Sequence, residues 1–221
     1  MSTELPSEEY LTPLYSQRDV AQILGASPST VQRWLMGYGT GGDHREPLVS
    51  GVDAGKGYTV PFLGLAEAFV LNAFRKAGLP MQRIRPAVDA LKREFGLEYV
   101  LASNRLAHDG AEILLRSEDE HDRRLVVVRD GQAVFNEVVE DYLKNIDFTV
   151  GYASKLHLPQ YRGLDVTVQP VINGGRPTLE RRGIALADVL GRVRAGESPR
   201  AVADDYGVEP EDVFRLNVLA A

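Results

Sequence analysis

Small and forked polar side chains between residues 27 and 33 form the part of the sequence best suited to specific hydrogen bonding. Serine, threonine and glutamine offer compact donors and acceptors, and arginine offers a planar fork of donors that fits guanine edges or phosphate oxygens. The stretch from Ser27 to Met36 contains one cation and no acid. These residue types indicate contacts to base edges or phosphates, with a solvated polar face as the alternative. The candidate DNA-contacting residues are Ser27, Ser29, Thr30, Gln32 and Arg33.

Two short helices joined by a tight turn are expected to carry these side chains. Ser16 is a predicted cap of the first helix, with Asp19 completing a capping box. Gly25 supplies the turn because glycine adopts a positive φ at little cost. Ser27 caps the second helix, and Pro28 takes its first position, where the missing N–H costs nothing. The apolar spacing around the turn predicts a helix-turn-helix rather than two unrelated core helices. Its core positions are Ala21, Leu24, Ala26, Val31 and Trp34.

A cationic segment follows the predicted helix-turn-helix. Residues 37–51 are glycine-rich and polar, which favours a loop or a small wing, and residues 60–78 are apolar enough for a buried helix. Residues 79–96 have the pattern of an amphipathic helix. From Arg75 to Arg93 there are six cations and one acid, within a chain of net charge −6. This segment is predicted to face phosphates through Arg83 and Arg85, with a solvated helix face as the alternative.

Residues 15–107 resemble the MerR-type winged helix-turn-helix. The matching residues are "YSQRDVAQILGASPSTVQRWL" and, after the loop, "FLGLAEAFVLNAFRKAGLPMQRIRPAVDALKREFG". The resemblance implies that the helix beginning at Pro28 lies in the major groove, while the wing and the following helices hold the DNA backbone. MerR proteins continue into a long dimerising helix, whereas "EYVLASNRLAHDGAEILLRS" is interrupted at Asn104, Asp109 and Gly110. This interruption argues against a MerR-style coiled coil and effector switch.

The same spacing recurs near the C-terminus in "SPRAVADDYGVEPEDVFRL". Gly207 is the turn, and the five core positions again fit. The second helix differs in charge, because Glu209, Glu211 and Asp212 outnumber Arg215. Phosphate would repel such a helix, so the pattern favours contact with a protein, with DNA contact or a plain scaffold as the alternatives. The core positions are Ala203, Tyr206, Val208, Val213 and Leu216.

Residues 169–221 resemble a small antitoxin-associated domain, whose "GGRP" loop and "AGESP" helix start both occur here. The usual "GTRI" of that family appears as "RRGI". Together with the MerR-like part, the chain resembles a VapB-type antitoxin, which implies a PIN-like, VapC-type ribonuclease toxin as partner. Such toxins hold a metal ion among carboxylates, which a cation of the antitoxin can block; solvated or phosphate-contacting arginines are the alternative. The candidate toxin-contacting residues are Arg176, Arg181, Arg182, Glu211, Asp212 and Arg215.

Several chemistries find no support in the sequence. The chain has no cysteine, which excludes disulfides and thiolate sites. His44, His108 and His157 lack a second histidine at helical ligand spacing, and the surroundings of His121 predict a solvated acidic loop. We therefore expect no metal, no cofactor and no enzymatic activity. The acidic N-terminus lacks the pattern of a signal peptide, and no apolar stretch is long enough for a bilayer, so a cytoplasmic protein is expected.

The central residues predict short strands and a short helix. "LVVVRDGQAVFNEV" predicts a hairpin turning at Asp130-Gly131. A further strand is expected within residues 111–117, a solvated loop within 117–124, a short helix within 136–148, and two strands within 155–172.

The predicted fold is α+β with three regions. Residues 1–107 form the MerR-like winged helix-turn-helix, 108–168 a small β/α connecting region, and 169–221 a trihelical toxin-binding domain. The predicted function is an antitoxin that neutralises its toxin and binds its own promoter, most simply as a homodimer because operators are usually two-fold symmetric. The alternative is a MerR-type regulator that responds to a small ligand.

Overall fold

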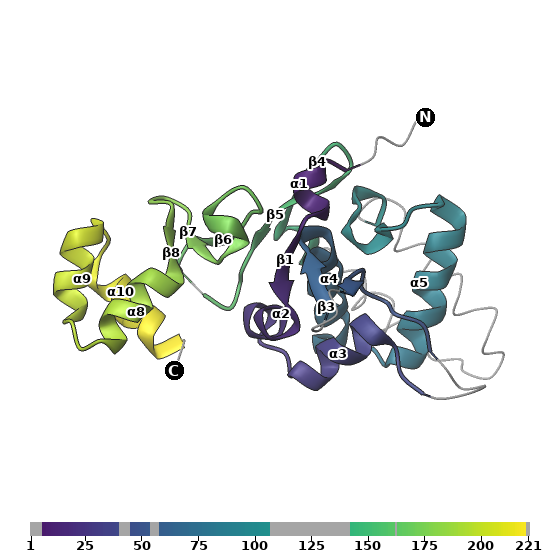
Figure 1. The fold of residues 1–221 in the computed structure, drawn as a ribbon, viewed down its shortest axis with the longest axis horizontal. Helices are drawn as coiled ribbons and strands as arrows, with labels where there is room; N and C mark the ends of the chain where they lie inside the picture. Colours follow the sequence, from purple (N-terminus) through teal and green to yellow (C-terminus); the bar gives the residue numbers. More distant parts are fainter. Residues whose placement is uncertain (1–5, 40–44, 54–57, 107–141, 162, 220–221) are drawn as a thin grey trace. The chain divides into compact units, whose positions relative to one another are not determined.

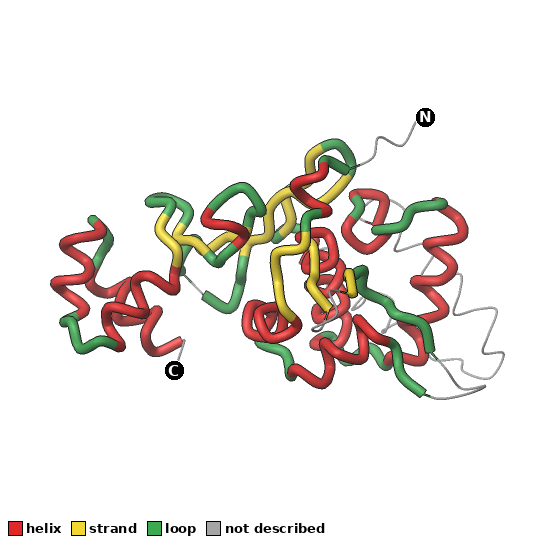
Figure 2. The backbone as a smooth tube through the Cα atoms, in the orientation of Figure 1, coloured by secondary structure: helices red, strands yellow, loops and turns green. Residues whose placement is uncertain are grey.

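The computed structural model describes residues 6–39, 45–53, 58–106, 142–161 and 163–219. The chain divides into two compact units, Met1–Ala153 and Ser154–Ala221, with the boundary inside strand β5. Helices and strands occur in both units (Figures 1 and 2), so the predicted α+β class is confirmed. No helix in the described part of the chain is long and apolar enough to cross a membrane.

The first unit combines a small antiparallel sheet with helices. Strand β3 is central in the order β1-β3-β2, pairing with β1 on one side and β2 on the other. The helices and strands of this unit are α1 (Glu8–Leu11), β1 (Pro13–Ser16), α2 (Gln17–Leu24), α3 (Pro28–Met36), β2 (Val52–Asp53), β3 (Tyr58–Pro61), α4 (Phe62–Lys76), α5 (Met81–Phe95), the 3-10 turn η2 (Val100–Ala102) and β4 (Ile146–Thr149).

The predicted helix-turn-helix is confirmed down to its caps. Ser16 Oγ accepts from the backbone N–H of Asp19 at 3.2 Å, and Asp19 Oδ2 accepts from the backbone N–H of Ser16 at 2.8 Å, which is a complete capping box. Gly25 ends α2 in the left-handed conformation, with φ 58°. Ser27 Oγ then caps α3 by accepting from the N–H of Thr30. The local sequence therefore marks where both helices begin and where α2 ends.

Helix α4 forms the core of the first unit, as its apolar composition predicts. Every residue from Phe62 to Phe74 is buried. Asn72 Nδ2 donates to the carbonyl oxygen of Leu24 at 2.9 Å, which satisfies a carbonyl at the end of α2 and ties α2 to α4. Gly64 permits close packing, because a Cβ there would lie 2.2 Å from the carbonyl oxygen of Ser50. The core thus fixes the helix-turn-helix against α4.

The sheet of the first unit was not anticipated from the sequence. Its strands are two to four residues long, so none offers a clear alternating pattern. Strands β2 and β3 pair antiparallel, with Val52 opposite Thr59, just after the stretch 37–51 for which a loop or a small wing is predicted. The predicted loop at 37–51 contains an isolated antiparallel bridge between Tyr38 and Arg45.

The second unit is an antiparallel sheet followed by three helices. Its strands pair antiparallel in chain order, β5 with β6, β6 with β7 and β7 with β8. Helix α10 packs against α8 and α9 around Val189, Val202, Val213 and Leu216, all buried. The elements are β5 (Tyr152–His157), β6 (Val166–Val168), the turn η4 (Asn173–Gly175), β7 (Thr178–Leu179), β8 (Ile184–Ala185), α8 (Leu186–Arg194), α9 (Pro199–Tyr206) and α10 (Pro210–Leu219).

The second helix-turn-helix pattern is also confirmed as structure. Ser198 Oγ caps α9 by accepting from the N–H of Ala201 at 3.2 Å. Gly207 ends α9 in the left-handed conformation at φ 62°. Of the five predicted core positions, Ala203, Val213 and Leu216 are fully buried, whereas Tyr206 and Val208 are half-buried. Each unit therefore contains two short helices joined at a glycine in the left-handed conformation, with different outer surfaces.

The predictions for the centre of the chain have mixed outcomes. The hairpin at Asp130-Gly131, the strand within 111–117 and the loop within 117–124 lie outside the described residues, as do His44, His108 and His121. The helix predicted within 136–148 is wrong at its end, where Ile146 begins strand β4 and is buried. The two strands predicted within 155–172 are confirmed as β5 and β6.

Candidate DNA-contacting and partner-contacting surfaces

The outward face of α3 is polar, as the helix-turn-helix spacing predicts. Val31 and Trp34 are buried, whereas Ser29, Gln32 and Arg33 are exposed. Gln17 Nε2 donates to the carbonyl oxygen of Pro28 at 2.7 Å and holds the start of α3 against α2. The helix therefore presents its polar side chains from a rigid frame.

Ser27, Ser29 and Thr30 form a cluster of hydroxyl groups at the start of α3. Ser27 Oγ lies 2.8 Å from Thr30 Oγ1 and 3.1 Å from Ser29 Oγ, in addition to capping the helix. Thr30 is only half-exposed. Gln32 has a long contact from Nε2 to Met36 Sδ, 3.6 Å. Gln32 and Arg33 are thus the side chains of α3 best placed to reach out from the surface.

A pocket of about 270 Å³ opens beside α3 and collects three of the arginines of the first unit. Arg33 reaches it from α3, Arg75 from the end of α4 and Arg85 from α5. None of the described residues lining it is acidic, so its charge is strongly positive. Such a concentration of guanidinium groups suits a phosphate oxygen. The remaining lining residues are Thr30, Trp34, Tyr38, Met81 and Gln82.

Arg85 also holds the segment that follows α3. Its Nη1 donates to the carbonyl oxygen of Glu46 at 2.6 Å, and its guanidinium stacks on Tyr38. Nε and Nη2 are covered from solvent and have no hydrogen-bond partner among the described residues. These contacts indicate that Arg85 positions the segment that follows α3. Arg33 and Arg75 are both exposed, so they are the arginines of this pocket that can turn toward a phosphate. Arg83 lies in α5, but its side chain is outside what the structure describes.

The predicted toxin-contacting residues divide between two places in the second unit. Arg181, Arg182 and Asp212 line a pocket of about 250 Å³. Arg215 lies next to Gly163, which also lines it. Arg176 instead pairs with Asp188 through Nη1 at 3.4 Å, and neither Arg176 nor the exposed Glu211 is among the described lining residues.

A cluster around Arg192 stabilises the three C-terminal helices. Arg192 donates from Nε to Glu197 at 2.8 Å and from Nη2 to Asp205 at 2.6 Å, and it stacks on Tyr206 at 5.4 Å. The ion pair raises the pKa of Arg192 and lowers that of Glu197, mainly through their hydrogen bonds. The cluster links α8 to α9 and so positions the helix-turn-helix of this unit.

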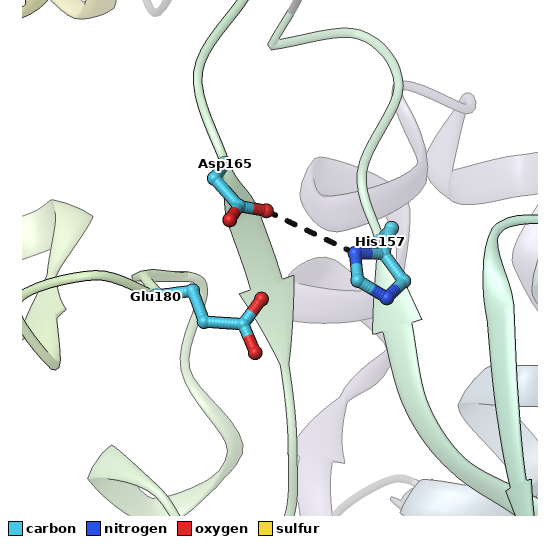
Figure 3. A group of neighbouring side chains, drawn as sticks. All are labelled: His157, Asp165 and Glu180. Atoms are coloured by element: carbon cyan, nitrogen blue, oxygen red, sulfur yellow. Dashed lines mark ion pairs between the residues drawn. The ribbon is translucent and has the colours of Figure 1, made fainter.

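Two further groups of titratable residues were missed by the sequence analysis. Burial raises the pKa of Glu67 to about 7, although Glu67 Oε2 accepts from the backbone N–H of Ser50 at 2.8 Å. His157, Asp165 and Glu180 converge on one face of the second unit's sheet (Figure 3). The sequence offers one indication of Glu67, because an acidic residue is unusual inside an otherwise apolar helix. The second group has no signal in the sequence, because strand register creates it.

Comparison with known proteins places each unit. Residues 13–88 match a family described as a putative DNA-binding HTH domain, and residues 166–216 match a family of proteins of unknown function, DUF433. The crystal structure of Rv2018 from Mycobacterium tuberculosis is similar with a TM-score of 0.77 and 36% sequence identity, covering 93% of this chain and 97% of that one.

Two relatives from Mycobacterium tuberculosis match over most of their length. The chain is 26% identical to the uncharacterized protein Rv2308, over 90% of this chain and 87% of the relative. It is 40% identical to the putative antitoxin VapB45, over 95% of both proteins. Because that similarity spans both units, the chain belongs to the VapB-type antitoxin family, with an N-terminal DNA-binding helix-turn-helix domain and a C-terminal DUF433 domain.

Proposed function

We propose that this protein is an antitoxin that neutralises a PIN-like, VapC-type ribonuclease and represses its own promoter. The observation that carries the DNA-binding half is the exposed polar face of α3 beside a pocket with three arginines and no described acid. The relative named as a putative antitoxin supports the other half. The role is that of a binding protein, and it requires no catalysis by this chain.

The first unit would read the operator through α3. Gln32 and Arg33 would reach base edges in the major groove, and the pocket would receive a backbone phosphate. Phosphate contacts fix orientation and add affinity that does not depend on sequence, whereas base contacts specify the site. Arg33 could contact either a base edge or a backbone phosphate, because it is exposed on α3 and also lines the pocket.

The second unit would bind the toxin rather than DNA. Glu209, Glu211 and Asp212 stand at the start of α10, where they suit the helix dipole but repel phosphate. Arg181 and Arg182 would approach the acidic metal site of the toxin. An antitoxin organised in this way offers one surface to the promoter and a different one to its partner.

A homodimer would complete the DNA-binding half. Helix-turn-helix proteins usually read two half-sites about 34–36 Å apart, so one copy of α3 recognises only half of such an operator. The proposal therefore includes binding of two chains per operator, which analytical ultracentrifugation of the protein–DNA complex would measure.

Two assays on the full chain test the proposal. Co-expression with the product of the neighbouring gene should restore growth that this product inhibits and yield a complex that co-purifies. A gel shift with the upstream promoter should be abolished or strongly weakened by Arg33→Ala and unaffected by Arg200→Ala, which replaces an exposed arginine of α9. Growth rescue without a co-purifying complex contradicts neutralisation by binding, and a promoter shift that both variants retain contradicts the role of α3.

A further inference from the structure

Three ligand-type side chains from neighbouring strands face one another in the second unit. His157 ends β5 and lies opposite Thr167 in the register of β5 and β6. Asp165 lies two residues from Thr167, so it shares that face of the sheet. The pairing of β6 with β7 continues from Val166 and Leu179 to Asp165 and Glu180, where the N–H of Glu180 donates to the carbonyl oxygen of Asp165 at 2.9 Å. Backbone register thus holds all three residues on one face.

The side chains meet as their backbones predict (Figure 3). One ligand atom from each lies within 4.8 Å of the other two, and His157 Nδ1 lies 3.9 Å from Asp165 Oδ1. Around a zinc ion bound at its usual ligand distances, such atoms would stand roughly 3.4 Å apart. Adjustment of exposed or half-buried side chains by about an ångström would close that difference.

Lys155 would compete with a metal ion for the carboxylate of Glu180. It lies two residues before His157 on β5, and its Nζ lies 2.5 Å from Glu180 Oε1. In the absence of a metal ion the ammonium compensates one of the two carboxylates. A divalent ion supplies more charge at the same place and would displace the ammonium from Glu180.

We propose that His157, Asp165 and Glu180 bind a divalent transition-metal ion, of which zinc is the best match. One imidazole nitrogen and two carboxylate oxygens are a ligand set that zinc accepts with a fourth position left for water. Calcium and magnesium prefer oxygen ligands alone, so the imidazole disfavours both ions. This inference is independent of the antitoxin role, because it rests only on the register and side chains of β5, β6 and β7.

The position of the site gives it a consequence for the neighbouring surface. Asp165 and Glu180 also line the pocket that contains Arg181 and Arg182. A bound dication would offset the charge of Asp165 and Glu180, so that Arg181 and Arg182 are balanced by Glu209 and Asp212 among the described lining residues. It would also cross-link three strands that are otherwise held by short ladders of two residue pairs each.

The test is calorimetric titration of the full, tag-free chain with zinc chloride, with a parallel titration by magnesium chloride. We expect zinc to bind at this site and magnesium to bind far more weakly. His157→Ala, Asp165→Asn and Glu180→Gln should each weaken zinc binding by more than about tenfold, since even outer partners of a metal site contribute 10–100-fold. The Asn and Gln variants preserve side-chain shape, and circular dichroism of each variant checks its fold.

Two more variants distinguish a metal site from an ion-pair network and from zinc bound elsewhere. Lys155→Met removes the competitor and should tighten zinc binding several-fold, whereas a mere ion-pair network predicts no gain. His121→Ala removes a histidine that four acidic residues flank in the sequence, and it should leave the affinity unchanged. Full zinc binding by His157→Ala and Asp165→Asn, or its loss in His121→Ala, would overturn the proposal.

Discussion

The guanidinium carbon of Arg85 lies 5.0 Å from the centroid of the Tyr38 ring. Tyr38 lies two residues after the end of α3, and Arg85 lies in the second turn of α5, so the contact ties the end of the candidate recognition helix to α5. The same arginine donates to the carbonyl oxygen of Glu46, in the segment that returns toward the core. Arg85 thereby shapes one wall of the arginine pocket.

We expect Arg85→Ala to destabilise the first unit. The change removes a charged hydrogen bond to a carbonyl and a cation–π contact, together about 1–3 kcal/mol. Trp34 is the sole tryptophan of the chain and is 2% exposed, so its fluorescence during urea unfolding reports this unit alone. Arg75→Ala is the matched control, because an exposed arginine should change the free energy of unfolding by no more than about 0.5 kcal/mol. Equal stability of the two variants would show that Arg85 has no positioning role.

Arg33 and Arg75 should differ in how they affect DNA binding. If Arg33 pairs with a base, Arg33→Ala should cost about 1–3 kcal/mol on the operator and relax the preference at one base pair. Arg75→Ala should weaken operator and unrelated DNA alike and lower the salt slope by about one. Fluorescence anisotropy at several salt concentrations measures both effects. A uniform loss for Arg33→Ala as well would assign both arginines to the phosphate backbone.

We expect Arg83→Ala to affect DNA binding in the same way as Arg75→Ala. Arg83→Ala should weaken binding evenly across DNA sequences and reduce the salt slope, because Arg83 belongs to the cationic stretch of α5. Unchanged affinity in this variant would restrict the phosphate contacts to the pocket itself.

Glu67 should make the first unit less stable as pH rises. Its pKa of about 7 in the folded protein exceeds the ordinary value of 4.5, so the folded state retains a proton that the unfolded chain has lost. The contribution is most favourable below pH 4.5 and is lost progressively up to pH 7, by an amount on the order of 3 kcal/mol.

Glu67→Gln is the variant that isolates this effect. It mimics the protonated acid and should remove this part of the pH dependence, so that its stability advantage over the parent grows between pH 5 and 7 and then levels off. Urea unfolding followed by Trp34 fluorescence at each pH measures the difference. A constant difference across that range would show that Glu67 keeps its ordinary titration.

The double variant Arg181→Ala/Arg182→Ala should weaken the complex with the toxin without affecting operator binding. Both arginines are exposed and line one pocket, so their loss removes charge from one surface. Surface plasmon resonance should show faster dissociation. Arg176→Ala is the control, since Arg176 already pairs with Asp188. A larger effect of Arg176 than of the pair would place the toxin near α8 instead.

Much of the local structure follows from the sequence because short-range interactions determine it. Capping by Ser16, Ser27 and Ser198 involves partners three residues away, and Gly25 and Gly207 adopt the conformation that glycine tolerates best. The 3.6-residue period then identifies the buried face of each helix. Both helix-turn-helix units and the charge contrast between α3 and α10 could therefore be predicted without a structure.

Only the tertiary structure decided which distant residues meet. The arginine pocket joins side chains from α3, α4 and α5, and no spacing in the sequence indicates that Arg33 and Arg75 share it. The sheet around β3 escaped prediction because strands of two to four residues have no clear period. The group of His157, Asp165 and Glu180 depends on strand register, since a shift of one residue would turn a side chain to the opposite face.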